Sequence, residues 1–187
     1  MADQETRGVA RLAASIAVPV ALVAGLAAYW ALGRTGSGNP GPTLPSVQAT
    51  GPVNMAAPRL SEDVAVDCRA LLAQLPDALR DRPRRPVTEG AEQNAAYGDP
   101  VVTLACGAGP RPSIPPTGHL LVMNSVCWYE ADDKDGTTWY AIDRMVPVTV
   151  HLPAAYQPAA QWAIEFSNPI AQSLPSITNV PTGCRDG

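Results

Sequence analysis

Of the 187 residues in the chain, 20 are proline and 15 are glycine, which excludes an all-helical bundle or a coiled coil. Only 16% of the residues are charged and the formal net charge is −4, which argues against the basic surface that a general nucleic-acid binder needs. Apolar residues make up 46% of the chain, enough for the core of one ordinary domain.

The first predicted element is a membrane-spanning helix over 12–32. This run carries no charge, and at about 1.5 Å per residue its length matches the roughly 30 Å hydrocarbon layer of a bilayer. Arg7 and Arg11 precede it and Arg34 follows it, which favours a cytoplasmic N-terminus over 1–11. The alternative is a signal peptide that is cleaved to release a secreted protein, because small residues end the run.

The segment 33–60 is predicted to be an extended linker. It is rich in proline and glycine and has no apolar period, so it cannot bury enough surface to offset the entropy lost on ordering. Residues 36–41 match the dinucleotide pattern G-x-G-x-x-G, but neither flank predicts the strand and helix which that chemistry requires. We therefore expect no cofactor.

The remaining residues, 61–187, predict a single domain that opens with a helix. Ser61 is a suitable N-cap, and apolar residues then recur at spacings of three and four from Val64 to Leu79. Pro76 is expected to end or bend this helix. The residues that follow, 80–86, are expected to form a basic loop stiffened by proline.

Strands and a second helix complete the predicted domain. Short β-branched or alternating runs predict strands over 101–106, 120–129, 137–144 and 146–152. A helix over 158–173 follows, with a kink or a break near Pro169. The order predicts an α+β fold with an antiparallel or mixed sheet of about four strands, packed by two helices on one face and preceded by one transmembrane helix. Trp128 and Trp139 are expected to pack in the core or across strands.

All four cysteines follow the apolar run. They are Cys68, Cys106, Cys127 and Cys184, and their even number in an exported domain predicts disulfide bonds. No two have the close spacing of zinc ligands, so no metal site is expected. Three pairings are open, and we favour Cys68–Cys106 with Cys127–Cys184 because the first would join the opening helix to the first strand.

Three short motifs lie within residues 60–180. They are DCRALL at 67–72 with its Leu75-Pro76, YGDP at 97–100 leading to LACG at 104–107, and VCW at 126–128. Together they resemble the actinobacterial domain-of-unknown-function 3515 family. The resemblance implies an exported envelope protein, tethered by a membrane segment or a lipid, and it implies no catalytic residue.

Side chains that could carry chemistry are few. His119 and His151 are expected to be structural, because no nucleophile or metal motif accompanies them. The acidic cluster over 130–135 is expected to be a solvated hairpin tip, since its spacing fails at both ends of a calcium loop. Candidate contacts for an anionic partner, by charge alone, are Arg80, Arg82, Arg84 and Arg85.

These features favour a membrane-anchored, extracytoplasmic binding or scaffold protein, an accessory subunit of a bacterial envelope or membrane complex. Its expected partners are the cytoplasmic membrane and an envelope or membrane protein, with no nucleic acid. The alternatives are an envelope hydrolase or transferase that uses Glu130, Asp132 and Asp143, and a module that binds cell-wall fragments. Two carboxylates in a deep apolar cleft would favour the enzyme, and a flat exposed sheet face would favour a partner surface.

Overall fold

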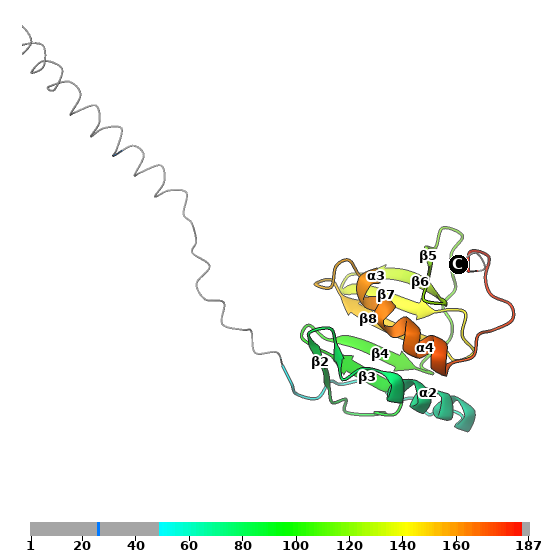
Figure 1. Cartoon of the computed structure of the whole chain (residues 1–187), viewed down its shortest axis with the longest axis horizontal. Helices are drawn as coiled ribbons and strands as arrows, with labels where there is room; N and C mark the ends of the chain where they lie inside the picture. Colours follow the sequence, from blue (N-terminus) through cyan, green and yellow to red (C-terminus); the bar gives the residue numbers. More distant parts are fainter. Residues whose placement is uncertain (1–25, 27–48, 185–187) are drawn as a thin grey trace, which may run out of the picture. The chain divides into compact units, whose positions relative to one another are not determined.

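The computed structural model describes Leu26 and residues 49–184 (Figure 1). The predicted N-terminal segment over 1–11 and, apart from Leu26, the predicted membrane helix over 12–32 lie outside these residues. Among the described residues, no helix is both long and apolar enough to cross a membrane.

The domain consists of one long helix, eight strands and a C-terminal helical segment. In chain order the elements are α2 (Glu62–Gln74), β1 (Ala78–Leu79), β2 (Arg82–Arg85), β3 (Asn94–Tyr97), β4 (Val102–Cys106), β5 (Leu120–Met123), β6 (Val126–Asp133), β7 (Gly136–Ala141), β8 (Val148–Pro153), α3 (Ala160–Ala163), the 3₁₀ turn η1 (Ile164–Phe166) and α4 (Ser167–Ser173). The strands form one sheet in the order β1-β2-β3-β4-β8-β7-β6-β5, and all its neighbours are antiparallel.

The prediction of about four strands is wrong, because the described residues form eight. The predicted transmembrane helix is likewise not seen among the described residues. The range 120–129 was expected to be one strand. Asn124 and Ser125 instead adopt positive φ angles of 47° and 64° and reverse the chain, which separates β5 from β6. The expected basic loop over 80–86 contains β2, which pairs with β1 and β3.

The helices and the core lie on one side of the sheet (Figure 1). Alternate residues of the strands point to this side, as in the buried positions Val102, Leu104 and Cys106 of β4. Trp128 and Trp139 are completely buried there, with their rings edge to face at a centroid distance of 6.4 Å. Their expected packing role is confirmed.

The C-terminal helical segment is interrupted, as Pro169 predicts. Two short helices, α3 and α4, are joined by the 3₁₀ turn η1, and Pro169 lies in the first turn of α4. A proline at this position lacks the N–H that would bond to the carbonyl of Glu165 in a continuous helix. Phe166 and Ile170 are buried in the core, whereas Trp162 is only half-buried.

Two disulfide bonds join Cys68 to Cys106 and Cys127 to Cys184, which is the favoured pairing. The first ties α2 to β4, and its Cα atoms are 5.6 Å apart. The second ties the C-terminal tail to β6. In the chain-entropy description, each bond contributes about 4 kcal/mol by restricting the unfolded chain.

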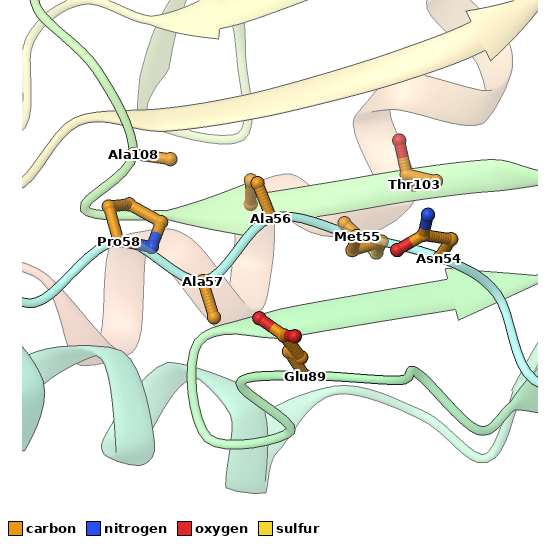
Figure 2. A pocket seen from close by; sticks show the side chains of 9 residues that line it. Asn54, Met55, Ala56, Ala57, Pro58, Glu89, Thr103 and Ala108 are labelled. Carbon is orange, nitrogen blue, oxygen red and sulfur yellow. The ribbon is translucent and has the colours of Figure 1, made fainter.

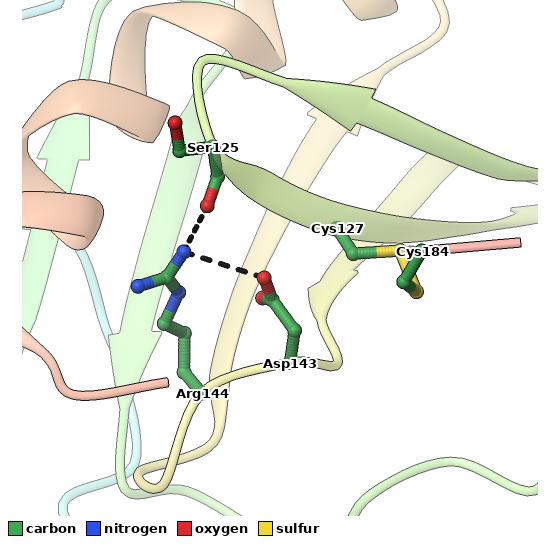
Figure 3. The surroundings of a disulfide bond; sticks show 5 residues. All are labelled: Ser125, Cys127, Asp143, Arg144 and Cys184. Atoms are coloured by element: carbon green, nitrogen blue, oxygen red, sulfur yellow. Dashed lines mark hydrogen bonds and ion pairs between the residues drawn. A yellow bond between two sulfur atoms is a disulfide. The ribbon is translucent and has the colours of Figure 1, made fainter. Parts of the chain in front are cut away.

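The turn after β7 contains Asp143 and Arg144 and lies near the second disulfide (Figure 3). Both residues contact the C-terminal tail or the elements next to it. Arg144 is buried, and its guanidinium donates hydrogen bonds to the carbonyls of Ser125 and Leu174 and to the carboxylate of Asp143. The backbone N–H of Ile177 donates to the carbonyl of Asp143 at 2.8 Å. This buried pair therefore joins the start of β6, the end of α4 and the tail.

Candidate functional site

The face of the sheet that points away from the helices, called here the outer face, carries half-buried side chains. Strand alternation places on it Thr103 and Ala105 of β4, Thr149 and His151 of β8, Thr138 and Tyr140 of β7, and Tyr129 of β6. All seven residues are half-buried, whereas the residues that alternate with them on β4, β7 and β8 are buried. Because a buried face would be apolar, this mixture of hydroxyl, imidazole and phenol groups marks a surface that stays in contact with water.

A strap of residues 51–60 covers one end of the outer face, over β3 and β4. The Asn94 amide donates to the carbonyl of Ala56 at 3.0 Å, and the Gln93 amide donates to the carbonyl of Pro58 at 3.2 Å. Asn94 and its neighbour Ala96 on β3 are consequently buried. The strap lies in the range that was predicted to be linker, so the folded domain extends to residues before Ser61.

A hollow of about 570 Å³ lies between the strap and the open part of the outer face (Figure 2). Thr103 and Ala105 of β4 line it together with Asn54, Met55 and Glu89. Thr103 is the cross-strand partner of His151. The hollow and the centre of the outer face therefore form one continuous surface.

His151 lies at the centre of this surface, opposite Thr138 of β7. Its Nδ1 is 3.2 Å from Oγ1 of Thr138 and 3.9 Å from Oδ2 of Asp133. A catalytic relay would need the hydroxyl and the carboxylate on different ring nitrogens, but here both face Nδ1. The arrangement is therefore not that of a catalytic relay.

Two tyrosines extend the outer face from His151 toward β5. Tyr129 and Tyr140 are cross-strand partners, and their rings are stacked at a centroid distance of 5.9 Å and an interplanar angle of 25°. Tyrosines give a binding surface a large contact area at a small cost in side-chain entropy. This pair places two stacked aromatic rings on the outer face.

Groups within the hairpin between β6 and β7 donate hydrogen bonds to its carboxylates. Asp133 accepts hydrogen bonds from the N–H groups of Asp135 and Gly136 at 2.8 and 3.0 Å. The bond from Asp135 is the main reason that the pKa of Asp133 lies below its ordinary value; desolvation opposes this shift and His151 adds to it. Among the described residues, no group of three or more histidine, cysteine or acidic side chains is placed to hold a metal ion.

The three carboxylates of the alternative hydrolase do not converge. Glu130 and Asp132 lie on the helix-facing side of β6, where desolvation raises the pKa of Glu130, Asp132 raises it further and His119 opposes the increase. Asp143 forms an ion pair with Arg144. The hydrogen bond from the Ile142 N–H to the Cys127 carbonyl places this pair near the other end of β6. Glu130 and Asp132 therefore lie at one place on the sheet and Asp143 at another, so the three carboxylates do not form a common site.

The four arginines singled out from the sequence all contact the protein itself. Arg80 lies over the Trp162 ring and pairs with Glu165 at 3.1 Å. Arg82 is 3.5 Å from Asp81, and Arg84 donates to the carbonyl of Leu72 at 3.3 Å. Arg85 donates to the carbonyls of Gly51 and Gly98. An anionic partner at this hairpin would compete with these contacts.

The outer face has a signal in the sequence. The period-two pattern in 136–141 and 148–153 places Thr138, Tyr140, Thr149 and His151 on one side, opposite the apolar residues. The hollow had no such signal, because half of its wall comes from the strap.

Residues 16–178 of the chain match the family described as "Protein of unknown function (DUF3515)". The match includes the whole outer face and the strap, and it confirms the resemblance drawn from the three motifs. Comparisons with curated proteins and with solved structures found no match.

Proposed function

We propose that this chain, which belongs to the DUF3515 family of unknown function, is an extracytoplasmic binding protein that uses the outer face to engage a partner. The role that fits best is an accessory subunit or scaffold of a bacterial envelope or membrane complex. The observation that carries the proposal is the open, half-buried surface of Tyr129, Tyr140, Thr149 and His151 on a sheet whose other side is packed by helices.

The disulfides support the location. All four cysteines are paired, and such bonds persist in oxidising compartments outside the cytoplasm. The charge-free run over 12–32 supplies an export signal, which would hold the protein at the membrane if retained and release it if cleaved.

The chemistry of the outer face supports a protein partner over an enzymatic role. Tyrosine is a residue that interfaces favour, and lysine and glutamate, which interfaces disfavour, are absent from the seven residues that define the surface. The hollow beside Thr103 offers space for a projecting side chain of the partner. The stacked tyrosines would also accept the ring of a saccharide, so a cell-wall fragment is the second candidate.

The test is a substitution at the centre of the outer face. Thr149→Arg places a long charged side chain there without entering the core, and Ala73→Arg does the same on the exposed side of α2. The full chain, extracted from membranes in mild detergent, should copurify a partner. Thr149→Arg should reduce the recovered partner by about tenfold or more, and Ala73→Arg should leave it unchanged.

Repeated recovery of the chain alone at native abundance would refute the subunit role. Thermal-shift measurements with soluble wall fragments address the second candidate. A rise in melting temperature that Thr149→Arg removes and Ala73→Arg retains would identify the outer face as a saccharide surface instead.

A further inference from the structure

The arginines in the described residues divide into two groups. Six contact acceptors within the protein: Arg80, Arg82, Arg84, Arg85, Arg111 and Arg144. Arg59 and Arg69 make no hydrogen bond or ion pair with any described residue. These two line the same hollow, which has a volume of about 390 Å³ and lies between the strap, α2 and the turn before β3.

We propose that Arg59 and Arg69 form a binding site for a phosphate group. Guanidinium groups bind phosphate oxygens through paired N–H donors, and two arginines with no partner among the described residues can both direct donors to one ligand. The site is distinct from the outer face and does not depend on its function.

The backbone that carries both arginines is fixed. Arg59 lies between Pro58, whose carbonyl accepts a hydrogen bond from buried Gln93, and Leu60, which packs against the core. Arg69 follows Cys68, which is completely buried and bonded to Cys106 of β4. The backbone at Arg59 and Arg69 is therefore already ordered before an anion binds. Binding would reduce the conformational entropy of the two side chains only.

The rest of the hollow defines the ligand further. Ala57, Leu60 and Ala65 provide apolar walls that would contact the carbon skeleton of a phosphate ester. Glu92 also lines the hollow and, as an anion, opposes the binding of phosphate. Glu92→Gln should therefore tighten binding, whereas loss of either arginine should weaken it.

Two sources of the phosphate are distinguished by two measurements on the full chain. In non-ionic detergent, inorganic phosphate is titrated at constant ionic strength and followed by the NMR signals of the arginine Nε–H groups. In lipid nanodiscs, hydrogen exchange of residues 57–69 is compared between phosphatidylcholine alone and phosphatidylcholine with phosphatidylglycerol. The first measures a free phosphate, and the second measures an anionic lipid headgroup.

Saturable binding or added protection in either experiment supports the site, and the experiment that responds identifies the source. Arg59→Gln and Arg69→Gln should each weaken the response by about tenfold. Lys134→Gln removes the same charge from an exposed hairpin tip and should have no effect. No response in both experiments, or equal loss with Lys134→Gln, overturns the proposal.

Discussion

The indole Nε1 of Trp128 donates a hydrogen bond to Oγ of Ser167 at 2.9 Å, and both side chains are completely buried. This bond joins β6 to α4 within the core. Ser167→Ala would leave the buried indole N–H without its acceptor, so we expect the free energy of unfolding to fall by about 1–3 kcal/mol. Chemical denaturation of the purified domain measures this loss.

Ser173 on the same helix is the matched control. Its Oγ is buried but has no hydrogen-bond partner among the described residues. Ser173→Ala therefore removes no bond, and alanine is the better helix former, so its stability should stay within about 0.5 kcal/mol of the parent. An equal fall in the free energy of unfolding in both variants would show that the hydrogen bond from Trp128 to Ser167 does not stabilise the packing of α4 on β6.

The regular elements of the fold could be predicted where periodicity was strong. The helix now seen as α2 and the strands β4, β7 and β8 follow from apolar spacing and β-branched residues. β3 could not be found this way, because Asn94–Tyr97 contains two alanines and no β-branched residue. Its burial depends on the strap, a contact between distant segments that a local pattern does not encode.

The arginine run shows that charge alone does not indicate whether the donors of an arginine are already occupied within the protein. Arg80 and Arg85 belong to a run with four arginines in six residues, but tertiary contacts with Glu165 and Gly51 occupy their donors. Arg59 and Arg69 are isolated in sequence, and only the packing of the strap on α2 brings them to one hollow.

Tyr97 should make the domain sensitive to alkaline pH. Its hydroxyl donates to the carbonyl of Pro76 at 3.0 Å, and burial is the main reason that its pKa rises from 10.0 to about 12; Arg84 opposes the shift and Asp77 adds to it. Because the raised pKa belongs to the folded state, the stabilisation is complete below pH 10 and is lost as the pH rises toward 12. Denaturation at increasing pH measures it.

Tyr97→Phe is the control for this pH dependence. The variant loses the hydrogen bond to Pro76, which should cost about 1 kcal/mol at neutral pH. It cannot ionise, so the part of the alkaline loss that comes from Tyr97 should disappear. A variant whose stability falls between pH 10 and 12 as steeply as the parent would assign the alkaline sensitivity to other groups.

The two disulfides should differ in their effect on the fold. Replacing Cys127 and Cys184 with alanine frees the tail from β6 and should lower the free energy of unfolding by up to about 4 kcal/mol, while cooperative unfolding is retained. The same change at Cys68 and Cys106 should cost more, because it also leaves space in the core where both residues are completely buried. Urea unfolding without reductant compares the two. The reverse order would mean that the tail contributes more to the core than its partly exposed cysteine suggests.

The Asp143–Arg144 pair should behave as a buried ion pair whose members depend on each other. The residues Asp143 and Arg144 are 7% and 5% exposed, and Arg144 also donates hydrogen bonds to the carbonyls of Ser125 and Leu174. Arg144→Met leaves the Asp143 carboxylate buried without its cation and should lower the free energy of unfolding by about 3–5 kcal/mol.

Adding Asp143→Asn to Arg144→Met tests whether charge or packing causes this loss. The double variant buries no unpaired charge, so it should be more stable than Arg144→Met alone. The recovery should be incomplete, because the carbonyls of Ser125 and Leu174 still lack the guanidinium donors. A double variant no more stable than Arg144→Met would mean that these carbonyl bonds, and not the ion pair, fasten the C-terminal tail to β6.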